Sequence, residues 1–248
     1  MVRANVDITS VRKGTYESKY TLQQLLNEGG NAKVYKCLRN DTGKEYAIKI
    51  LNTSKPGEKL SRFSNEIIVM QTYGGTANGV LPIIDADPYD GWYVIPVAIP
   101  IEAYFLENKS SIKDKVDAIA KLAKTLEILH KKGITHRDIK PDNLFCYEET
   151  YCFGDFGLCE YPEGEEVYTR TDKQLGAFNT IAPEMYKNPQ GQDGQKADVY
   201  SLAKTLWILL TGDKKGFQGP YSSEDSAISF VKFAYLKEEQ LALIELVL

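Results

Sequence analysis

Residues 135–145 read THRDIKPDNLF, and this short stretch is the most informative part of the chain. Between positions 138 and 143 it places a carboxylate, an ammonium group and an amide, at Asp138, Lys140 and Asn143. Pro141 lies among them, and a proline is not tolerated in the interior of a helix. We therefore expect a loop that presents these three groups to one reaction.

The composition limits the class of protein. A chain of 248 residues is long enough for one large domain or for two small lobes, each with its own core. The net charge of -4, from 34 acidic and 30 basic residues, gives no polybasic surface, so we expect no nucleic-acid partner. No apolar run of about 18 residues occurs. The start MVRANVDITS also lacks the apolar core of a signal peptide, so we expect no membrane span and a cytoplasmic location.

Cysteine and histidine usage indicates which metals could bind. The four cysteines are widely spaced and form no C-x-x-C pair, so we interpret them as reduced thiols of the core. The only histidines are His130 and His136, which argues against a histidine-rich metal site. A bound metal would therefore contact carboxylate oxygens, the ligands that magnesium prefers.

The first part of the chain predicts strands and one helix. Residues 20–36 predict a hairpin with Gly29 and Gly30 at its tip, and residues 44–51 predict a further strand. Residues 61–73 predict a helix with Ser61 as the N-cap. Within residues 91–100 we expect a buried strand that is stopped by Pro96 and Pro100.

From residue 112 onward the pattern becomes helical. Residues 111–133 predict a long amphipathic helix that ends at a glycine, and the apolar face of this helix carries Ile119, Leu122, Leu126 and Leu129. Residues 196–212 predict a core helix, and the tail from Ser222 is also typical of a helix. The chain therefore predicts an α+β fold of two lobes, residues 1–96 and 97–248.

Several further motifs accompany the opening stretch. They are YAIKIL at 46–51, GDFGL at 154–158, APE at 182–184 and DVYSLA at 198–203. Together with HRDIKPDN, these motifs resemble eukaryotic-type protein kinases, and the match is spread over most of the chain. The resemblance implies a bilobal fold with a small β-rich N-lobe containing one main helix. It also implies a larger, mainly helical C-lobe, which here would lack its last helix.

The resemblance assigns roles to the residues of the opening stretch. Asp138 would accept or orient the proton of the substrate hydroxyl, and Lys140 would reach the transferring phosphate. Asn143 and Asp155 would bind magnesium. Phosphoryl transfer depends mostly on positioning and on neutralisation of charge, which explains why these groups are needed close together.

The resemblance also implies a nucleotide site in the N-lobe. Lys49 would hold the phosphates of ATP, with Glu66 as its ion-pair partner and Glu58 as the alternative partner. Alignment on Val34 puts Asn27, Gly29 and Ala32 at the three positions that are usually glycine. The residues that this alignment places around ATP are Leu26, Gly29, Gly30, Val34, Ala47, Lys49, Glu66, Ile95, Pro96 and Ala98.

Substrate class and regulation follow from the same resemblance. Lys140 is typical of serine/threonine kinases, although Ala177 stands where those kinases usually have a threonine. Arg137 directly precedes Asp138, which implies that a phosphate on Thr169 or Thr171 pairs with this arginine and orders the loop. The acidic residues EGEE at 163–166 could supply part of that charge.

The late part of the chain departs from the family. Glu184 would pair with an arginine of a late helix, yet no arginine follows Arg170. We therefore expect a piece of a longer protein, whose missing C-terminal segment could be regulatory, or a partner for Glu184 from elsewhere.

Three functions remain open on the sequence. The first is an ATP- and Mg²⁺-dependent serine/threonine kinase that acts on a protein substrate and on its own activation loop. The second is a pseudokinase or ATP-binding scaffold, for which the irregular glycine loop and Ala177 argue. The third is a small-molecule kinase on a related fold.

Overall fold

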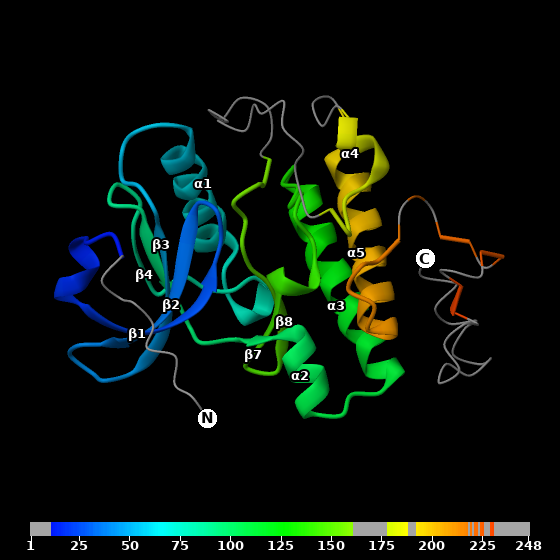
Figure 1. Ribbon diagram of the computed structural model, residues 1–248, viewed down its shortest axis with the longest axis horizontal. Helices are drawn as coiled ribbons and strands as arrows, with labels where there is room; N and C mark the ends of the chain where they lie inside the picture. The colour runs from blue at the N-terminus through cyan, green and yellow to red at the C-terminus, as the bar shows by residue number, and fades with distance from the viewer. Residues whose placement is uncertain are drawn as a thin grey trace. The chain divides into compact units, whose positions relative to one another are not determined.

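The computed structural model describes residues 11–160, 178–187, 192–217, 219, 221–222, 224–225 and 229–230 (Figure 1). The chain divides into two compact units, Met1–Ala98 and Ile99–Leu248, so the division lies two residues after the expected one. The first unit is a sheet with one long helix and the second is mainly helical. The predicted α+β fold class is confirmed.

A five-stranded antiparallel sheet forms the first unit, in the order β1-β2-β3-β5-β4. Its strands are β1 (Tyr20–Glu28), β2 (Ala32–Arg39), β3 (Glu45–Leu51), β4 (Asp85–Asp87) and β5 (Trp92–Ile95). The hairpin predicted over residues 20–36 and the strand predicted over residues 44–51 are both confirmed.

The long helix of the first unit is α1 (Glu58–Tyr73). It begins three residues before the predicted start, so the assignment of Ser61 as the N-cap is wrong. Ser61 lies inside the first turn, where its hydroxyl donates to the Gly57 carbonyl (3.2 Å). Gly57, at φ 151°, occupies the N-cap position, and such a backbone conformation is accessible mainly to glycine.

The two faces of the sheet carry different side chains: one is an aromatic and apolar core, and the other carries Lys49. Side chains alternate between faces along a strand, so residues that pair directly across strands project from the same face. Tyr35, Ile48 and Val94 are paired in this way and belong to a buried cluster on one face. The cluster consists of Tyr16, Tyr20, Tyr35, Cys37, Tyr46, Ile48, Ile50, Trp92 and Val94. The other face carries Lys49.

A segment before β1 covers the aromatic face and was not predicted from the sequence. It includes the 3₁₀ helix η2 (Thr15–Ser18). The Tyr16 ring packs edge-on against Trp92, with ring centroids 6.4 Å apart, and its hydroxyl donates to the Arg12 carbonyl (2.8 Å). The indole N–H of Trp92 donates to the Thr15 hydroxyl (2.8 Å).

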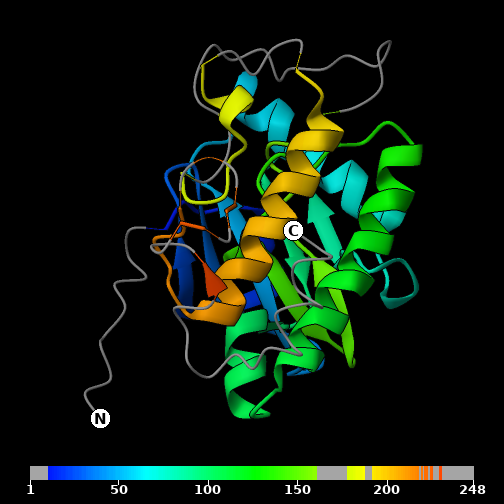
Figure 2. The ribbon, with the colours of Figure 1, turned by 90° about the vertical axis from the view of Figure 1, so that its right-hand side faces the viewer.

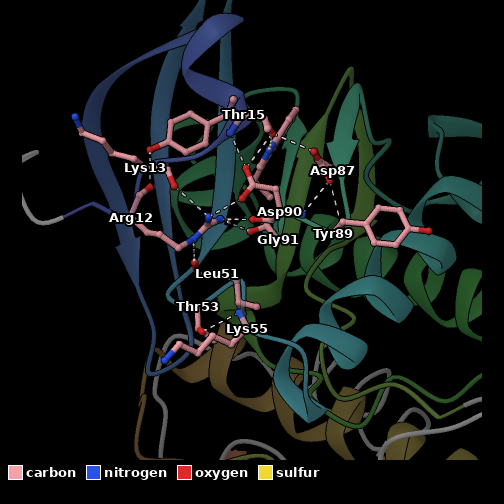
Figure 3. Close-up of polar contacts among 12 residues, drawn as sticks. Arg12, Lys13, Thr15, Leu51, Thr53, Lys55, Asp87, Tyr89, Asp90 and Gly91 are labelled. Atoms are coloured by element: carbon pink, nitrogen blue, oxygen red, sulfur yellow. Dashed lines mark hydrogen bonds and ion pairs between the residues drawn. The ribbon is translucent and has the colours of Figure 1, made fainter.

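Arg12 binds this segment to the end of β3 and to the loop between β4 and β5 (Figure 3). Its guanidinium forms an ion pair with Asp90 (2.8 Å), bonds to the Asp90 carbonyl and donates to the carbonyl of Leu51 (3.0 Å). Asp90 also accepts from the Thr15 amide (2.6 Å). Residues 11–19 are therefore an integral part of the first unit.

The second unit combines a small sheet with helices. The sheet contains β6 (Ile99–Pro100), β7 (Leu144–Tyr147) and β8 (Thr150–Phe153), and the short helices are α2 (Ile101–Glu107), η4 (Pro141–Asn143) and α4 (Pro183–Lys187). The buried strand predicted from Gly91 is β5, which ends at Ile95 as expected before Pro96, whereas Ile99 and Pro100 form the separate strand β6, which pairs with β7. Pro96 follows β5 and has no N–H with which to continue the ladder.

Two long helices, α3 (Ile112–Lys131) and α5 (Gly194–Thr211), lie side by side in this unit, as Figure 2 shows. The Lys115 ammonium of α3 donates to the Leu209 carbonyl of α5 (2.8 Å). The Ser111 hydroxyl and the Asp114 carboxylate form a capping box at the start of α3. Both predicted helices are confirmed, and the predicted apolar face of α3 is buried.

Two predictions from the sequence can be compared only with the described part of the chain. Most of the helix predicted from Ser222 lies outside the described residues. In the part of the chain that the structure describes, no helix is both long and apolar enough to cross a membrane.

Candidate active site

Lys49 stands in the middle of the sheet. It pairs with Val34 of β2 on one side and with Tyr93 of β5 on the other. Ala47 lies two residues earlier on the same strand and pairs with Ile95. These five side chains project from the same face, because paired residues share a face and strands alternate with a period of two.

A buried ion pair joins Lys49 to α1. The Lys49 ammonium lies 2.8 Å and 3.0 Å from the two carboxylate oxygens of Glu66, whose side chain is 1% exposed. The Tyr93 hydroxyl donates to the same carboxylate (2.7 Å). The predicted ion pair is therefore present. The alternative partner, Glu58, pairs instead with Arg62 one turn along α1.

Helical spacing places Glu66 at this position. Phe63, Glu66, Ile67 and Met70 are all buried and recur at intervals of three and four residues, so they lie on one face of α1. A carboxylate on such a face must find a cation or several donors. Lys49 meets that need, and the rings of Phe63 and Tyr93 lie 5.9 Å and 5.7 Å from its ammonium.

The predicted glycine loop connects β1 to β2. Asn27 pairs with Val34, and the Gly29 amide donates to the Ala32 carbonyl (2.9 Å). Neither Gly29 nor Gly30 has a positive φ, and a Cβ atom at Gly30 would meet nothing within 4 Å. Leu26, another residue predicted to contact the nucleotide, is 47% exposed. The turn itself therefore does not require glycine at either position.

The predicted hinge follows β5 directly. Ile95 is half-buried at the end of the strand, Pro96 is buried and Ala98 is half-buried. Residues 96–98 form no strand or helix, as expected where proline interrupts a ladder.

In the second unit, the opening stretch of the sequence forms a cluster around Asp138. The Lys140 ammonium lies 2.7 Å from one oxygen of the Asp138 carboxylate, and the side-chain amide of Asn143 donates to the same oxygen (3.0 Å). Asn143 also donates to the Asp138 carbonyl (2.8 Å). Pro141 begins the short helix η4, a position that needs no N–H. The three groups predicted to act together are therefore in contact.

Asp198 of α5 holds the backbone that precedes Asp138. Its fully buried carboxylate accepts from the amides of His136 and Arg137, at 2.7 Å each. The ring of His130 lies 3.0 Å from the same carboxylate. Arg137 has a φ of 64°, a conformation that costs a non-glycine residue about 1–2 kcal/mol. The two hydrogen bonds to a buried carboxylate offset that cost.

Asp155 lies on a second loop that is packed against the first. The Gly154 amide donates to the Asn143 carbonyl (2.9 Å), and the carbonyl of Gly154 lies 3.2 Å from the ring of His136. That ring also contacts Phe156, with ring centroids 4.6 Å apart. Asp155, like Arg137, has a positive φ, of 58°. These contacts fix the position of Asp155 relative to Asn143.

The donor atoms fit the magnesium ion that the resemblance implies. The side-chain nitrogen of Asn143 is used on Asp138, so its amide oxygen is the atom left for a metal. Asp155 adds a carboxylate, and oxygen ligands of this kind suit Mg²⁺. In the described ranges, no group of three His, Cys, Asp or Glu side chains could hold a metal ion. The remaining ligands would come from phosphates and water.

The model of the protein kinase domain family matches residues 20–240, which is most of the chain. The chain belongs to the protein kinase domain family.

Named relatives of this kinase domain agree on the subgroup. It is 29% identical over 223 residues to MAP kinase-interacting serine/threonine-protein kinase 2 of Xenopus laevis, covering 80% of this chain and 46% of that protein. It is 29% identical over 225 residues to serine/threonine-protein kinase DCLK1 of Rattus norvegicus, covering 87% and 49%. The kinase domain therefore spans about half the length of these relatives.

The residues that were predicted to be regulatory are described only in part. Thr169, Thr171 and Ala177 lie outside the described residues. Arg137, the predicted partner of a phosphate, has a guanidinium that pairs with the carboxylate of Glu160. Glu184 is exposed, and no cation forms an ion pair with it in the described ranges.

Three residues of the kinase site were not identified from the sequence, and they differ in how easily they could have been found. Tyr93 precedes Ile95 by two residues, so strand alternation places it on the face of Lys49. Asp198 is the one acidic residue of the mostly buried helix α5, and a buried carboxylate requires partners. Glu160 has no such pattern, because its partner lies 23 residues earlier in the chain.

Proposed function

We propose that this chain is a serine/threonine protein kinase that transfers the γ-phosphate of ATP to a protein hydroxyl. The observation that carries the proposal is the cluster in which Lys140 and Asn143 converge on one oxygen of Asp138. A carboxylate with one oxygen engaged by a cation and an amide has its other oxygen in a defined direction. That oxygen is suited to orienting a hydroxyl and accepting its proton.

The remaining roles follow from charge. Lys49 would hold the α- and β-phosphates of ATP, and the buried Glu66 carboxylate keeps its ammonium in place. Val34, Ala47 and Ile95 share a face with Lys49 and would contact the nucleotide, together with Leu26, Gly29 and Gly30 of the loop and Pro96 and Ala98 of the hinge. Asn143 and Asp155 would hold Mg²⁺, which supplies positive charge against the phosphates.

The substrate, the sites of self-phosphorylation and the location of the protein are also proposals. The substrate would be a protein with a serine or threonine acceptor, because this class is named for the relatives. Thr169 and Thr171 are the proposed sites of self-phosphorylation. A cytoplasmic location would suit the four cysteines, which are buried and form no disulfide in the described part of the chain.

The test is label transfer from γ-labelled ATP and magnesium to a basic protein, followed by identification of the labelled amino acids. Asp138→Asn removes the carboxylate charge without changing the size of the side chain. We expect turnover to fall about 100-fold or more in this variant, the usual contribution of a general base. ATP binding should be retained, since Asp138 holds neither phosphates nor metal in this scheme.

The matched control is Asp142→Asn. Asp142 lies in the same loop but is exposed, so this variant should keep full turnover. Equal turnover in Asp138→Asn and the control would remove Asp138 from the mechanism. ATP binding without any transfer by the unaltered protein would instead favour the pseudokinase or scaffold.

A further inference from the structure

Arg137 lies in a position that requires a negative charge nearby. Its side chain is 4% exposed, and its buried Nε atom has no hydrogen-bond partner among the residues that the structure describes. Burying an unpaired charge costs several kcal/mol, so a guanidinium in this position must be paired. Asp198 does not meet this need, because it accepts its hydrogen bond from the backbone amide of Arg137 and not from the guanidinium.

Glu160 supplies the charge. Its carboxylate pairs with the Arg137 guanidinium, and its side chain remains 42% exposed. Its backbone is held as well, because Glu160 and Thr135 exchange two hydrogen bonds, from the Thr135 amide (3.1 Å) and from the Glu160 amide (3.0 Å). Glu160 is therefore fixed both through its side chain and through its main chain.

The contacts of Glu160 with Arg137 and Thr135 connect the chain segments that carry the two predicted carboxylates of the site, Asp138 and Asp155. Arg137 directly precedes Asp138, and Glu160 follows Asp155 by five residues. Arg137 and Asp155 both have positive φ angles, so each lies in a backbone conformation that the surrounding contacts must maintain. The pair joins the two strained segments to each other. Loss of the ion pair would weaken the connection between these segments, which the backbone hydrogen bonds between Thr135 and Glu160 would still join.

We propose that Glu160 is a positioning residue for phosphoryl transfer, whose carboxylate holds Arg137 and the catalytic loop in place without phosphorylation of Thr169 or Thr171. The inference rests on the proposed kinase function. A phosphate usually orders such a loop by giving an arginine an anionic partner. Here the partner is already part of the chain. A phosphate brought to the same arginine would be repelled by the Glu160 carboxylate.

The experiment compares the unaltered protein, Glu160→Gln, Glu160→Asp and the double variant Thr169→Ala/Thr171→Ala, each measured with and without prior phosphatase treatment. The control is Glu107→Gln, an exposed glutamate at the end of α2. For Glu160→Gln we expect kcat to fall about 10-fold to 100-fold, a loss in the range caused by small misplacements of catalytic groups. The KM for ATP should change little, because Lys49 and Glu66 are untouched.

The other variants separate positioning from simple folding defects. Glu160→Asp keeps the charge and should recover part of the lost kcat. The Thr169→Ala/Thr171→Ala variant and the phosphatase-treated protein should keep the rate of the untreated protein. Hydrogen exchange at the amides of residues 135–138 should be faster in Glu160→Gln than in the control.

Failure of the inference can be distinguished from failure of the kinase function. Transfer only by phosphorylated protein, or equal rates and equal exchange in Glu160→Gln and the control, would overturn the inference and leave the kinase function intact. No transfer by the unaltered protein in any state would overturn the kinase function. In that case hydrogen exchange alone decides whether the Glu160 pair holds the loop.

Discussion

Lys49 and the predicted site residues paired with it in the first unit stand on β-strands, whereas Asp138 and Asp155 of the second unit stand on loops. On the strands, the register of β2, β3 and β5 places Val34, Lys49 and Tyr93 side by side with ordinary backbone angles. On the loops, Arg137 and Asp155 have positive φ angles. A sheet positions its side chains through its own ladder, whereas a loop needs a buried acceptor such as Asp198 to hold its amides.

The largest effect should follow from removing that acceptor. Asp198→Asn keeps the shape of the side chain but cannot accept from the His136 and Arg137 amides as strongly, and it places an N–H donor against them. We expect the free energy of unfolding to fall by roughly 3–5 kcal/mol, since hydrogen bonds to charged groups contribute about 1.5–3 kcal/mol each. Urea denaturation of this variant beside Asp142→Asn measures the difference. A loss below that of a typical surface substitution would mean that the loop holds its own conformation.

The sheet should tolerate a comparable change better. Lys49→Met removes the cation from the buried Glu66 carboxylate and should lower the free energy of unfolding by about 2–3 kcal/mol, less than for a fully enclosed pair, because Lys49 is 13% exposed. Adding Glu66→Leu should recover most of this loss, because the unpaired charge is then gone. Label transfer should be lost in both variants. Urea denaturation of the two single variants and the double variant checks the recovery, and strictly additive losses would contradict it.

A second buried lysine sharpens the comparison. Lys204 of α5 lies 4.2 Å from the ring of Phe217 and 5.6 Å from that of Tyr200, and no carboxylate forms an ion pair with it in the described ranges. Burial lowers the pKa of Lys204 to about 8. Lys49 therefore lies between rings with a carboxylate, whereas Lys204 lies between rings alone.

The lowered pKa of Lys204 gives a defined pH dependence. An unfolded lysine titrates near pH 10.4, so the unfolded chain binds more protons between about pH 8 and 10.4 and stability rises with pH there. Lys204→Met should raise the free energy of unfolding at pH 7 by roughly 1–3 kcal/mol, at about 1.4 kcal/mol per unit of pKa. The gain should shrink toward pH 10. Thermal unfolding at pH 7 and pH 10 measures this gain, and the exposed Lys124→Met variant is the control. A gain of equal size at both pH values would contradict the prediction.

The smallest change in the free energy of unfolding is expected for residues 11–19, the segment that covers the sheet. Burial alone would raise the pKa of Asp90, but hydrogen bonds from the Thr15 amide, Arg12 and the Thr15 hydroxyl together hold this pKa below its usual range. Asp90 therefore contributes stability above the unfolded pKa near 4, and this contribution is lost as the pH falls through the lower folded value.

Asp90→Asn should remove that acid-sensitive contribution, of about 1 kcal/mol for a partly exposed pair. The free energy of unfolding measured from pH 6 to pH 3 should then fall less steeply than in the unaltered protein. Asp41→Asn, whose side chain is 62% exposed, is the control. Parallel curves for Asp90→Asn and the unaltered protein would show that Arg12 holds the segment through carbonyl groups alone.

Periodic segments were predicted well from the sequence, and long-range contacts were not. The hairpin around Gly29, the face of α3 and the grouping of Asp138 with Asn143 all depend on neighbours in the chain. The start of α1 was misplaced because Ser61 resembles an N-cap residue. In the structure, Gly57 is the N-cap, and its positive φ sets where the helix begins. Residues 11–19 have no apolar period, so nothing in their order reveals that Arg12 contacts Asp90, 78 residues away.

The segment before β1 shows that the start of the family match and the start of the folded unit are different positions in this chain. The family match begins at Tyr20, yet the Tyr16 ring covers Trp92, and Arg12 balances the charge of Asp90. A shortened protein that began at Tyr20 would retain every predicted site residue but would expose part of an aromatic surface, which favours aggregation. For this protein, the family match begins later along the chain than the piece that excludes water from the core of the first unit.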